Sequence, residues 1–102
     1  MLWFLVAVYI YNCTKLQLSC SNNLQFLNLF SDDNIILVRY NIAKNEICTN
    51  EIYNKLVNDK SYIVRSAVAK NAPLRVAKKM INDREDRVKF TLEKRIINDI
   101  TN

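Results

Sequence analysis

Arginine, lysine and aspartate recur along this chain of 102 residues at spacings that could form ion pairs. Each of three basic residues follows an aspartate by six positions, in the pairs Asp33 with Arg39, Asp59 with Arg65 and Asp83 with Lys89. An arginine and a carboxylate form a bidentate, directional pair, which would fix the register between neighbouring structural units. The same basic residues could instead bind an anionic partner, and the aspartates could simply cap helices. The fixed spacing favours the structural pairing.

A second set of basic residues could form a binding face. Residues 60–95 contain eleven Lys or Arg and four Asp or Glu, which gives a net charge of +7. Residues 1–59 contain four Lys or Arg and five Asp or Glu, which gives a net charge of −1. The candidate face consists of Lys44, Lys70, Arg75, Lys78, Lys79 and Lys94. Such a face could bind a phosphate backbone or an acidic protein. An ordinary solvated surface is the simpler interpretation, because Tyr62 and Phe90 are expected nearer the core than a stacking platform would be.

Composition excludes several classes of chemistry. The chain has no Gly, so phosphate-binding loops and the dinucleotide fingerprint are impossible. It has no His, which removes the commonest general base, the usual catalytic triads and most zinc sites. Its three cysteines, Cys13, Cys20 and Cys48, are odd in number and form no CxxC pair, so reduced thiols are expected. The sequence therefore predicts neither a catalytic set nor a bound metal.

An internal repeat explains why these residues recur. The phrase VRYNIAKN at residues 38–45 returns as VRSAVAKN at 64–71 and, more loosely, as VKFTLEKR at 88–95, with spacings of 26 and 24. Self-similarity at a period of 20 to 50 residues is the signature of a repeat protein. The frame predicts a buried stripe at i, i+4 spacing in each copy, formed by Val38 with Ile42, Val64 with Val68 and Val88 with Leu92. Further apolar positions, Phe30, Leu56 and Met80, precede each aspartate by three.

Each copy has the pattern of two helices. In the central copy, residues 49–59 place Ile52 and Leu56 on one face, with Thr49 as N-cap, and Ser61 or Asp59 can cap the next helix. In the last copy Pro73 is tolerated in the first turn of a helix. We therefore expect one helical domain over residues 21–102, with units at about 21–45, 46–71 and 72–97, because a unit alone cannot bury its apolar face.

The segment 1–20 lies outside this frame. It opens with MLWFLVAVYIY, whose apolar run is too short to span a bilayer as a helix. It has no charge before Lys15 and no evident cleavage site, unlike a signal peptide. A packed helix or strand, a cap, a truncated preceding repeat, a weak leader, a membrane-surface anchor and a chance extension of the reading frame all remain open.

The central copy, VRSAVAKN preceded by LVNDKS, resembles the bacterial leucine-rich repeat variant and is similar to the broader HEAT-like helical repeats. The matching positions are Asp59, Val64, Arg65, Val68, Ala69 and Asn71. The resemblance covers about residues 21–95 and implies a right-handed solenoid of short helices. A prototype of that family carries a cysteine-ligated iron–sulfur cluster, but the three cysteines here lack its spacing, so no cofactor is expected.

The sequence thus predicts an all-α, right-handed helical-repeat solenoid of about three two-helix units. We expect a non-catalytic binding scaffold, most simply for a protein partner, in a bacterial cytoplasm. Binding of nucleic acid or another acidic surface through the basic face of the C-terminal half is the alternative, and an enzyme comes third.

Overall fold

The computed structural model describes residues 2–101, and this part of the chain is helical throughout, with no strand. The elements in chain order are α1 (Leu2–Leu18), α2 (Leu24–Phe30), α3 (Ile36–Lys44), α4 (Asn50–Leu56), α5 (Tyr62–Asn71), α6 (Leu74–Ala77), the 3₁₀ turn η1 (Lys78–Met80) and α7 (Asp86–Thr101). The expected all-α class is confirmed. None of the helices in this region is long and apolar enough to cross a membrane.

Polar side chains cap the starts of α2, α4 and α5. The Thr49 hydroxyl accepts a hydrogen bond from the backbone N–H of Ile52, which confirms the predicted cap of α4. Ser61 caps α5 in a similar way, by accepting from the N–H of Ile63. Asp59 instead orders the preceding turn, where its Oδ1 accepts from the Ser61 N–H at 2.9 Å. Short polar side chains thus satisfy N–H groups that a helix start leaves unpaired.

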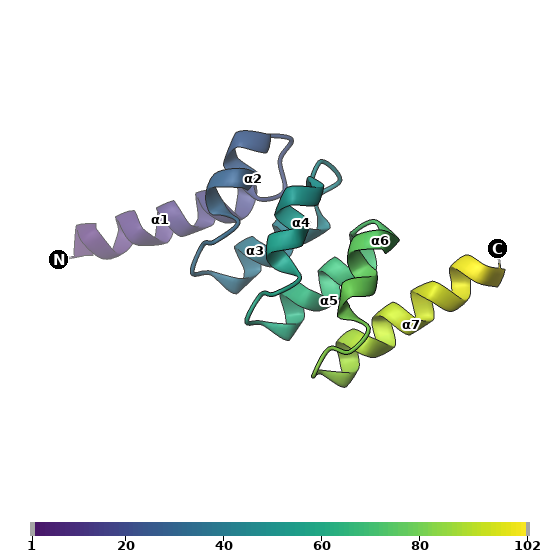
Figure 1. The fold of residues 1–102 in the computed structure, drawn as a ribbon. Coiled ribbons are helices and arrows are strands. Elements are labelled where there is room, and N and C mark those ends of the chain that lie inside the picture. The colour runs from purple at the N-terminus through teal and green to yellow at the C-terminus, as the bar shows by residue number, and fades with distance from the viewer. Residues whose placement is uncertain (1, 102) are drawn as a thin grey trace.

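The first helix contains no residue in its first turns that would interrupt it. Tyr9 stands six residues before Lys15, at the place that an aspartate takes in the three later copies. Residues 2–11 contain no Ser, Thr, Asp, Asn or Pro that could cap a new helix or break this one. The chain therefore continues as one helix of 17 residues, and its first turns extend away from the other helices (Figure 1).

The helices form two layers. One layer contains α1, α3, α5 and α7, each in contact with the next, and the other contains α2, α4 and the α6–η1 segment (Figure 1). Helices that follow one another in the chain also pack across the two layers. Because each helix contacts mainly the helices one or two places away in the chain, the molecule is elongated, with principal extents of 55 × 26 × 20 Å.

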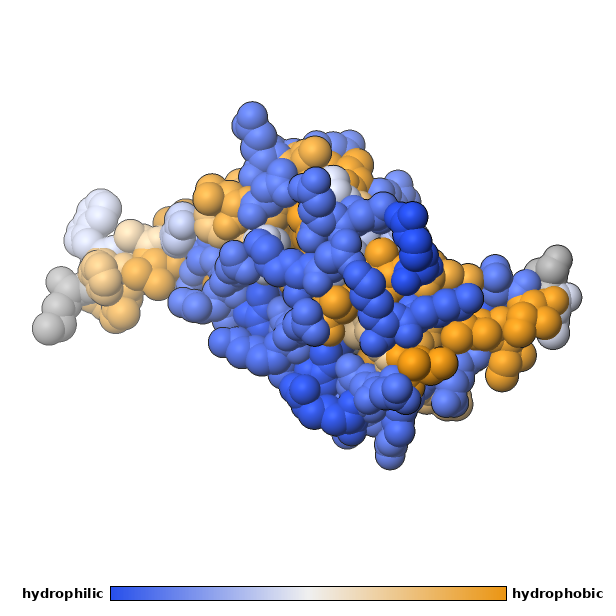
Figure 2. Space-filling view, in the orientation of Figure 1, coloured by the Kyte–Doolittle hydropathy of each residue, from blue (hydrophilic) through white to orange (hydrophobic). Residues whose placement is uncertain are grey.

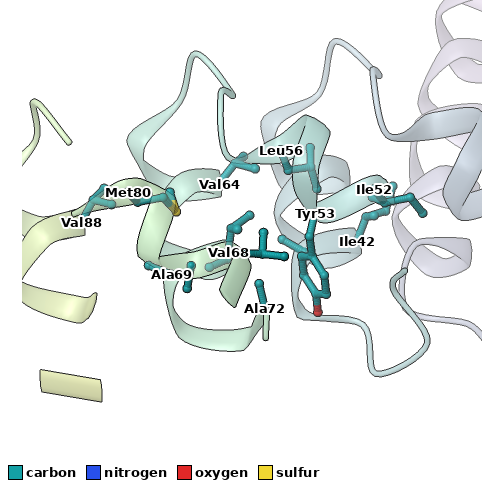
Figure 3. Packing of buried hydrophobic residues seen from close by; sticks show 14 of the residues in the cluster. Ile42, Ile52, Tyr53, Leu56, Val64, Val68, Ala69, Ala72, Met80 and Val88 are labelled. Carbon is teal, nitrogen blue, oxygen red and sulfur yellow. The ribbon is translucent and has the colours of Figure 1, made fainter. Parts of the chain in front are cut away.

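The repeated apolar stripe forms the core between the layers. The predicted pairs Val38 with Ile42, Val64 with Val68 and Val88 with Leu92 are all fully buried. Leu56 and Met80, from the other layer, belong to the same buried cluster (Figure 3). Phe30, at the equivalent position of the first copy, is only half-buried and packs on Phe26 with ring centroids 4.4 Å apart. Burial of these side chains is the main favourable contribution to folding.

The last copy differs from its expected form. Its first helix is reduced to four residues and continues as the 3₁₀ turn. Pro73 is the N-cap of this helix, one position before the first turn, and its missing N–H costs nothing at a helix start. In α7 the buried stripe consists of Val88 and Leu92, and Ile100 near the end of the helix is 77% exposed.

Candidate functional site

Arg39 is buried and joins two copies of the repeat. Its Nε donates to Asp59 Oδ2 at 2.7 Å and its Nη2 donates to Asp59 Oδ1 at 3.1 Å. Its Nη1 donates to the backbone carbonyl of Asp33 at 2.6 Å. The side chains of this pair are 4% and 6% exposed. The aspartate six residues before the arginine therefore supplies a carbonyl, and the aspartate of the next copy supplies the carboxylate.

Arg65 repeats the arrangement one copy later. Its Nε and Nη2 donate to the two carboxylate oxygens of Asp83, at 2.9 and 3.3 Å, and its Nη1 donates to the Asp59 carbonyl at 2.8 Å. Asp59 therefore contacts both arginines, through its carboxylate and through its carbonyl. We call this chain of contacts the ion-pair ladder. Because both guanidinium groups are buried and fully engaged, neither is exposed to a partner in solvent.

Lys15 begins the ladder, although the sequence pattern did not point to it. Its Nζ lies 2.9 Å from Asp33 Oδ1, and both side chains are largely buried. The ammonium group also lies 4.6 Å from the centre of the Tyr11 ring, within cation–π range. One feature of the sequence does indicate this role: Lys15 lies 24 residues before Arg39, and Arg65 lies the same distance before Lys89. The C-terminal part of α1 therefore takes the place that the second helix of a repeat takes elsewhere.

Lys89, the fourth residue of this series, is placed differently. Its Nζ lies 3.3 Å from Asp86 Oδ1 in the same helix, with side chains 39% and 94% exposed. Within residues 2–101 no aspartate of a following copy reaches it. Lys89 thus belongs to the surface, and Asp83, six residues before it, pairs with Arg65 instead.

Lys44, Lys70 and Lys94 all lie exposed on the layer that contains α3, α5 and α7. They line three adjoining hollows with volumes of about 270, 210 and 430 Å³. The first and second hollows share Lys44, and the second and third share Lys70 and Thr91. The three lysines therefore line a row of adjoining hollows across α3, α5 and α7, which we call the lysine groove.

Aromatic and polar groups complete the lysine groove. Tyr40 lies beside Lys44, whose Nζ is 5.0 Å from the ring centre. Phe90 lines the third hollow and is 65% exposed. The expectation that Phe90 lies near the core is therefore wrong, because its position on α7 corresponds to Ser66 on α5, which faces the groove. Glu46 is the one acidic residue that lines these three hollows. The groove is thus basic with two aromatic rings.

The remaining basic candidates lie in the other layer. Arg75 on α6 and Lys78 on η1 are exposed and line none of the groove's hollows. Lys79 donates to Asn54 Oδ1 at 2.6 Å. The six candidate residues therefore separate into the three lysines of the groove and three residues of the α6–η1 segment.

Polar side chains cover much of the visible middle of the molecule, while apolar surface lies toward its two ends (Figure 2).

Cysteine and acidic side chains form no candidate metal centre in residues 2–101. This region has no group of three or more Cys, Asp or Glu placed to hold a metal ion. Cys13, Cys20 and Cys48 form no disulfide. Burial raises the pKa of the Cys48 thiol to about 11, and burial together with the nearby thiol raises the pKa of Tyr53 to about 12. A thiol of such high pKa is a poor nucleophile at neutral pH.

Comparison with protein-family models, with curated proteins and with solved structures finds no match for this chain. The lysine groove is consequently the feature on which an assignment of function has to rest.

Proposed function

We propose that this chain is a non-catalytic helical-repeat scaffold, a right-handed solenoid similar to the leucine-rich repeat variant, and that its lysine groove binds an acidic segment of a protein partner. The observation that carries the proposal is the row of adjoining hollows lined by Lys44, Lys70 and Lys94. Each lysine comes from a different helix of one layer, so a ligand that lies across the helices would meet all three.

The ion-pair ladder supports the repeat part of the proposal. Equivalent residues of successive copies make equivalent contacts, as in the pairs Arg39 with Asp59 and Arg65 with Asp83. A repeat protein is stabilised by such interfaces between neighbouring units and presents an extended binding surface along one side. In this chain that surface corresponds to the exposed side of α3, α5 and α7.

The spacing of the lysines favours an extended peptide. Packed helices lie about 8–10 Å apart, so successive lysines recur at about that distance along the groove. An extended chain advances about 3.3 Å per residue, so carboxylates at every third position would match one lysine per helix. Tyr40 and Phe90 offer apolar contact between the charges. Complementary charge of this kind mainly provides specificity and faster association.

Nucleic acid is the second candidate, and the exposure of Phe90 favours it. An aromatic ring beside lysines is the arrangement on which single-stranded nucleic acids stack their bases and neutralise their phosphates. Phe90 shares its hollow with Lys70, Lys94 and Arg95, three basic residues. Because one exposed ring gives one stacking position, we expect this binding to be weak and independent of sequence.

Fluorescence anisotropy with a labelled peptide that has Glu at every third position tests the proposal. The double variant Lys70→Glu with Lys94→Glu should lower affinity at least about tenfold, because it reverses the charge of two of the three groove lysines. Arg75→Glu with Lys78→Glu is the matched control, since it makes the same change in net charge in the other layer. Equal losses in the two double variants, or equal binding of a peptide with Gln in place of Glu, would contradict a defined groove.

A further inference from the structure

The first turns of α1 expose more apolar surface than any other helix between residues 2 and 101. All of its residues from Leu2 to Tyr11 are exposed. The large side chains among them are 40–88% exposed and are Leu2, Trp3, Phe4, Leu5, Val6, Val8, Tyr9, Ile10 and Tyr11. A contiguous apolar patch of this kind marks a surface that another molecule covers.

The exposed residues surround the helix. They are consecutive in sequence, and 3.6 residues complete a turn, so ten of them cover every side. A helix that docks into a protein groove needs one apolar stripe and keeps a polar face toward water. This segment has no polar face, because the first polar residue after Met1 is Asn12 and the first charged residue is Lys15. An apolar medium on all sides fits the segment better than a groove on one side.

The other end of α1 is fixed to the body. The Lys15 ammonium pairs with Asp33 at 2.9 Å. Asn41 Nδ2 donates to the Ser19 hydroxyl and Asn45 Nδ2 donates to the Ser19 carbonyl, both at 3.1 Å. These contacts hold the helix by its C-terminal part, while the apolar turns extend beyond the body (Figure 1). The apolar ends and the polar middle are both visible on the molecular surface (Figure 2).

We propose that residues 2–11 insert into one leaflet of a lipid bilayer and tether the helical repeats to its surface. The segment is about 15 Å long, since a helix rises about 1.5 Å per residue, and this is half the thickness of the hydrocarbon core. A run of this length suits an interfacial segment. Insertion of a segment that is apolar on all sides depends on the acyl chains rather than on lipid charge.

The aromatic residues fix the depth of the segment. Trp3 lies near its start, and Tyr9 and Tyr11 near its end, and such side chains concentrate at the boundary between headgroups and acyl chains. In that position the N–H groups of its first turn remain within reach of headgroups and water, which a helix end in pure hydrocarbon would lack.

Fluorescence of Trp3 tests the proposal in the intact chain, because it is the single tryptophan. Addition of neutral phosphatidylcholine vesicles should shift its emission to shorter wavelength, and lipids brominated on their acyl chains should quench it. Leu5→Lys should lower partitioning into these vesicles at least about tenfold, since a lysine within the apolar layer is costly. Leu29→Lys on α2 is the matched control, because Leu29 is 71% exposed, close to the 64% of Leu5, and should leave partitioning unchanged.

Each other result would overturn the proposal. Unchanged emission with vesicles would mean that the segment does not enter lipid. A blue shift without vesicles that grows with protein concentration would make a second copy of the chain the occupant. Binding that requires anionic lipid and persists in Leu5→Lys would assign membrane contact to the surface lysines. Circular dichroism of both variants verifies that the helices remain folded.

Discussion

Arg39 and Asp59 lie twenty residues apart in the chain and form a bidentate ion pair that is almost completely buried. The same carboxylate also accepts the backbone N–H of Ser61, so it orders the turn before α5 while it binds an arginine of α3. One side chain thereby joins the start of one helix to the side of its neighbour. Arg65 and Asp83 reproduce this joint between α5 and α7.

Breaking the ladder should destabilise the fold. Arg65→Ala leaves the Asp83 carboxylate buried without its partner, and we expect the free energy of unfolding to fall by about 3–5 kcal/mol. Urea denaturation followed by circular dichroism measures the change. Lys89→Ala is the matched control, because Lys89 occupies the equivalent position with an exposed partner, and its effect should stay below about 1 kcal/mol. Equal losses in both variants would mean that the buried pair is not a special contact.

The sequence predicted the core better than it predicted the ladder. Val64 and Val68 could be assigned to the interior because their i, i+4 spacing and their repetition are local features. The partner of Arg39 could not be identified from the sequence, because its carboxylate comes from the next copy and its position depends on how two copies pack. Lys15 was missed because Tyr9 replaces the aspartate of the frame and Thr14 replaces the valine. Phe90 was misplaced because an aromatic residue was assumed to follow the apolar stripe, while its own position faces the groove.

A charge in the core should unfold the chain. Val64 is fully buried, and Val64→Asp would place a carboxylate among apolar side chains, which is strongly unfavourable without a partner. Ile63→Asp is the control, because Ile63 is the neighbouring residue and is 42% exposed. Circular dichroism at 25 °C should show helix loss for the first variant and a nearly unchanged spectrum for the second. A folded and equally stable Val64→Asp protein would contradict the assigned core.

Removal of the exposed part of α1 should leave the remaining helices folded. Residues 2–11 are exposed throughout, so deleting residues 1–11 removes little buried surface, and we expect the melting temperature to change by less than about 4 °C. Lys15→Ala should cost more, because Asp33 then loses its buried partner. A large drop in melting temperature on deletion alone would show that the apolar turns cap the first copy.

The Cys48 thiol should react slowly and should make the fold sensitive to alkaline pH. Its pKa rises from the ordinary value of 9.0 to about 11, so at pH 8 its thiolate fraction and its alkylation rate should be about 100-fold below those of an ordinary thiol. Between pH 9 and 11 the folded state keeps a proton that the unfolded state loses, so stability should fall as pH rises through this window. Mass spectrometry after iodoacetamide treatment, with the exposed Cys20 as internal reference, measures the first effect. Denaturation of wild type and Cys48→Ala at pH 8 and pH 11 measures the loss of stability with rising pH. This loss should be smaller in the variant.

Salt dependence should separate the two candidate ligands of the lysine groove. If Lys44, Lys70 and Lys94 each neutralise one phosphate, the logarithm of the affinity for duplex DNA should fall with the logarithm of salt concentration with a slope of about −3. Lys70→Glu should then weaken every sequence alike, because phosphate contacts carry no base information. The acidic-protein proposal predicts instead that DNA binding stays weak at physiological salt in both wild type and variant. The Glu-bearing peptide should then bind the wild type more tightly than the variant. Helix content should be unchanged in either case, since Glu and Lys have similar helix propensities. Tight DNA binding at physiological salt that Lys70→Glu abolishes would make nucleic acid the ligand of this groove.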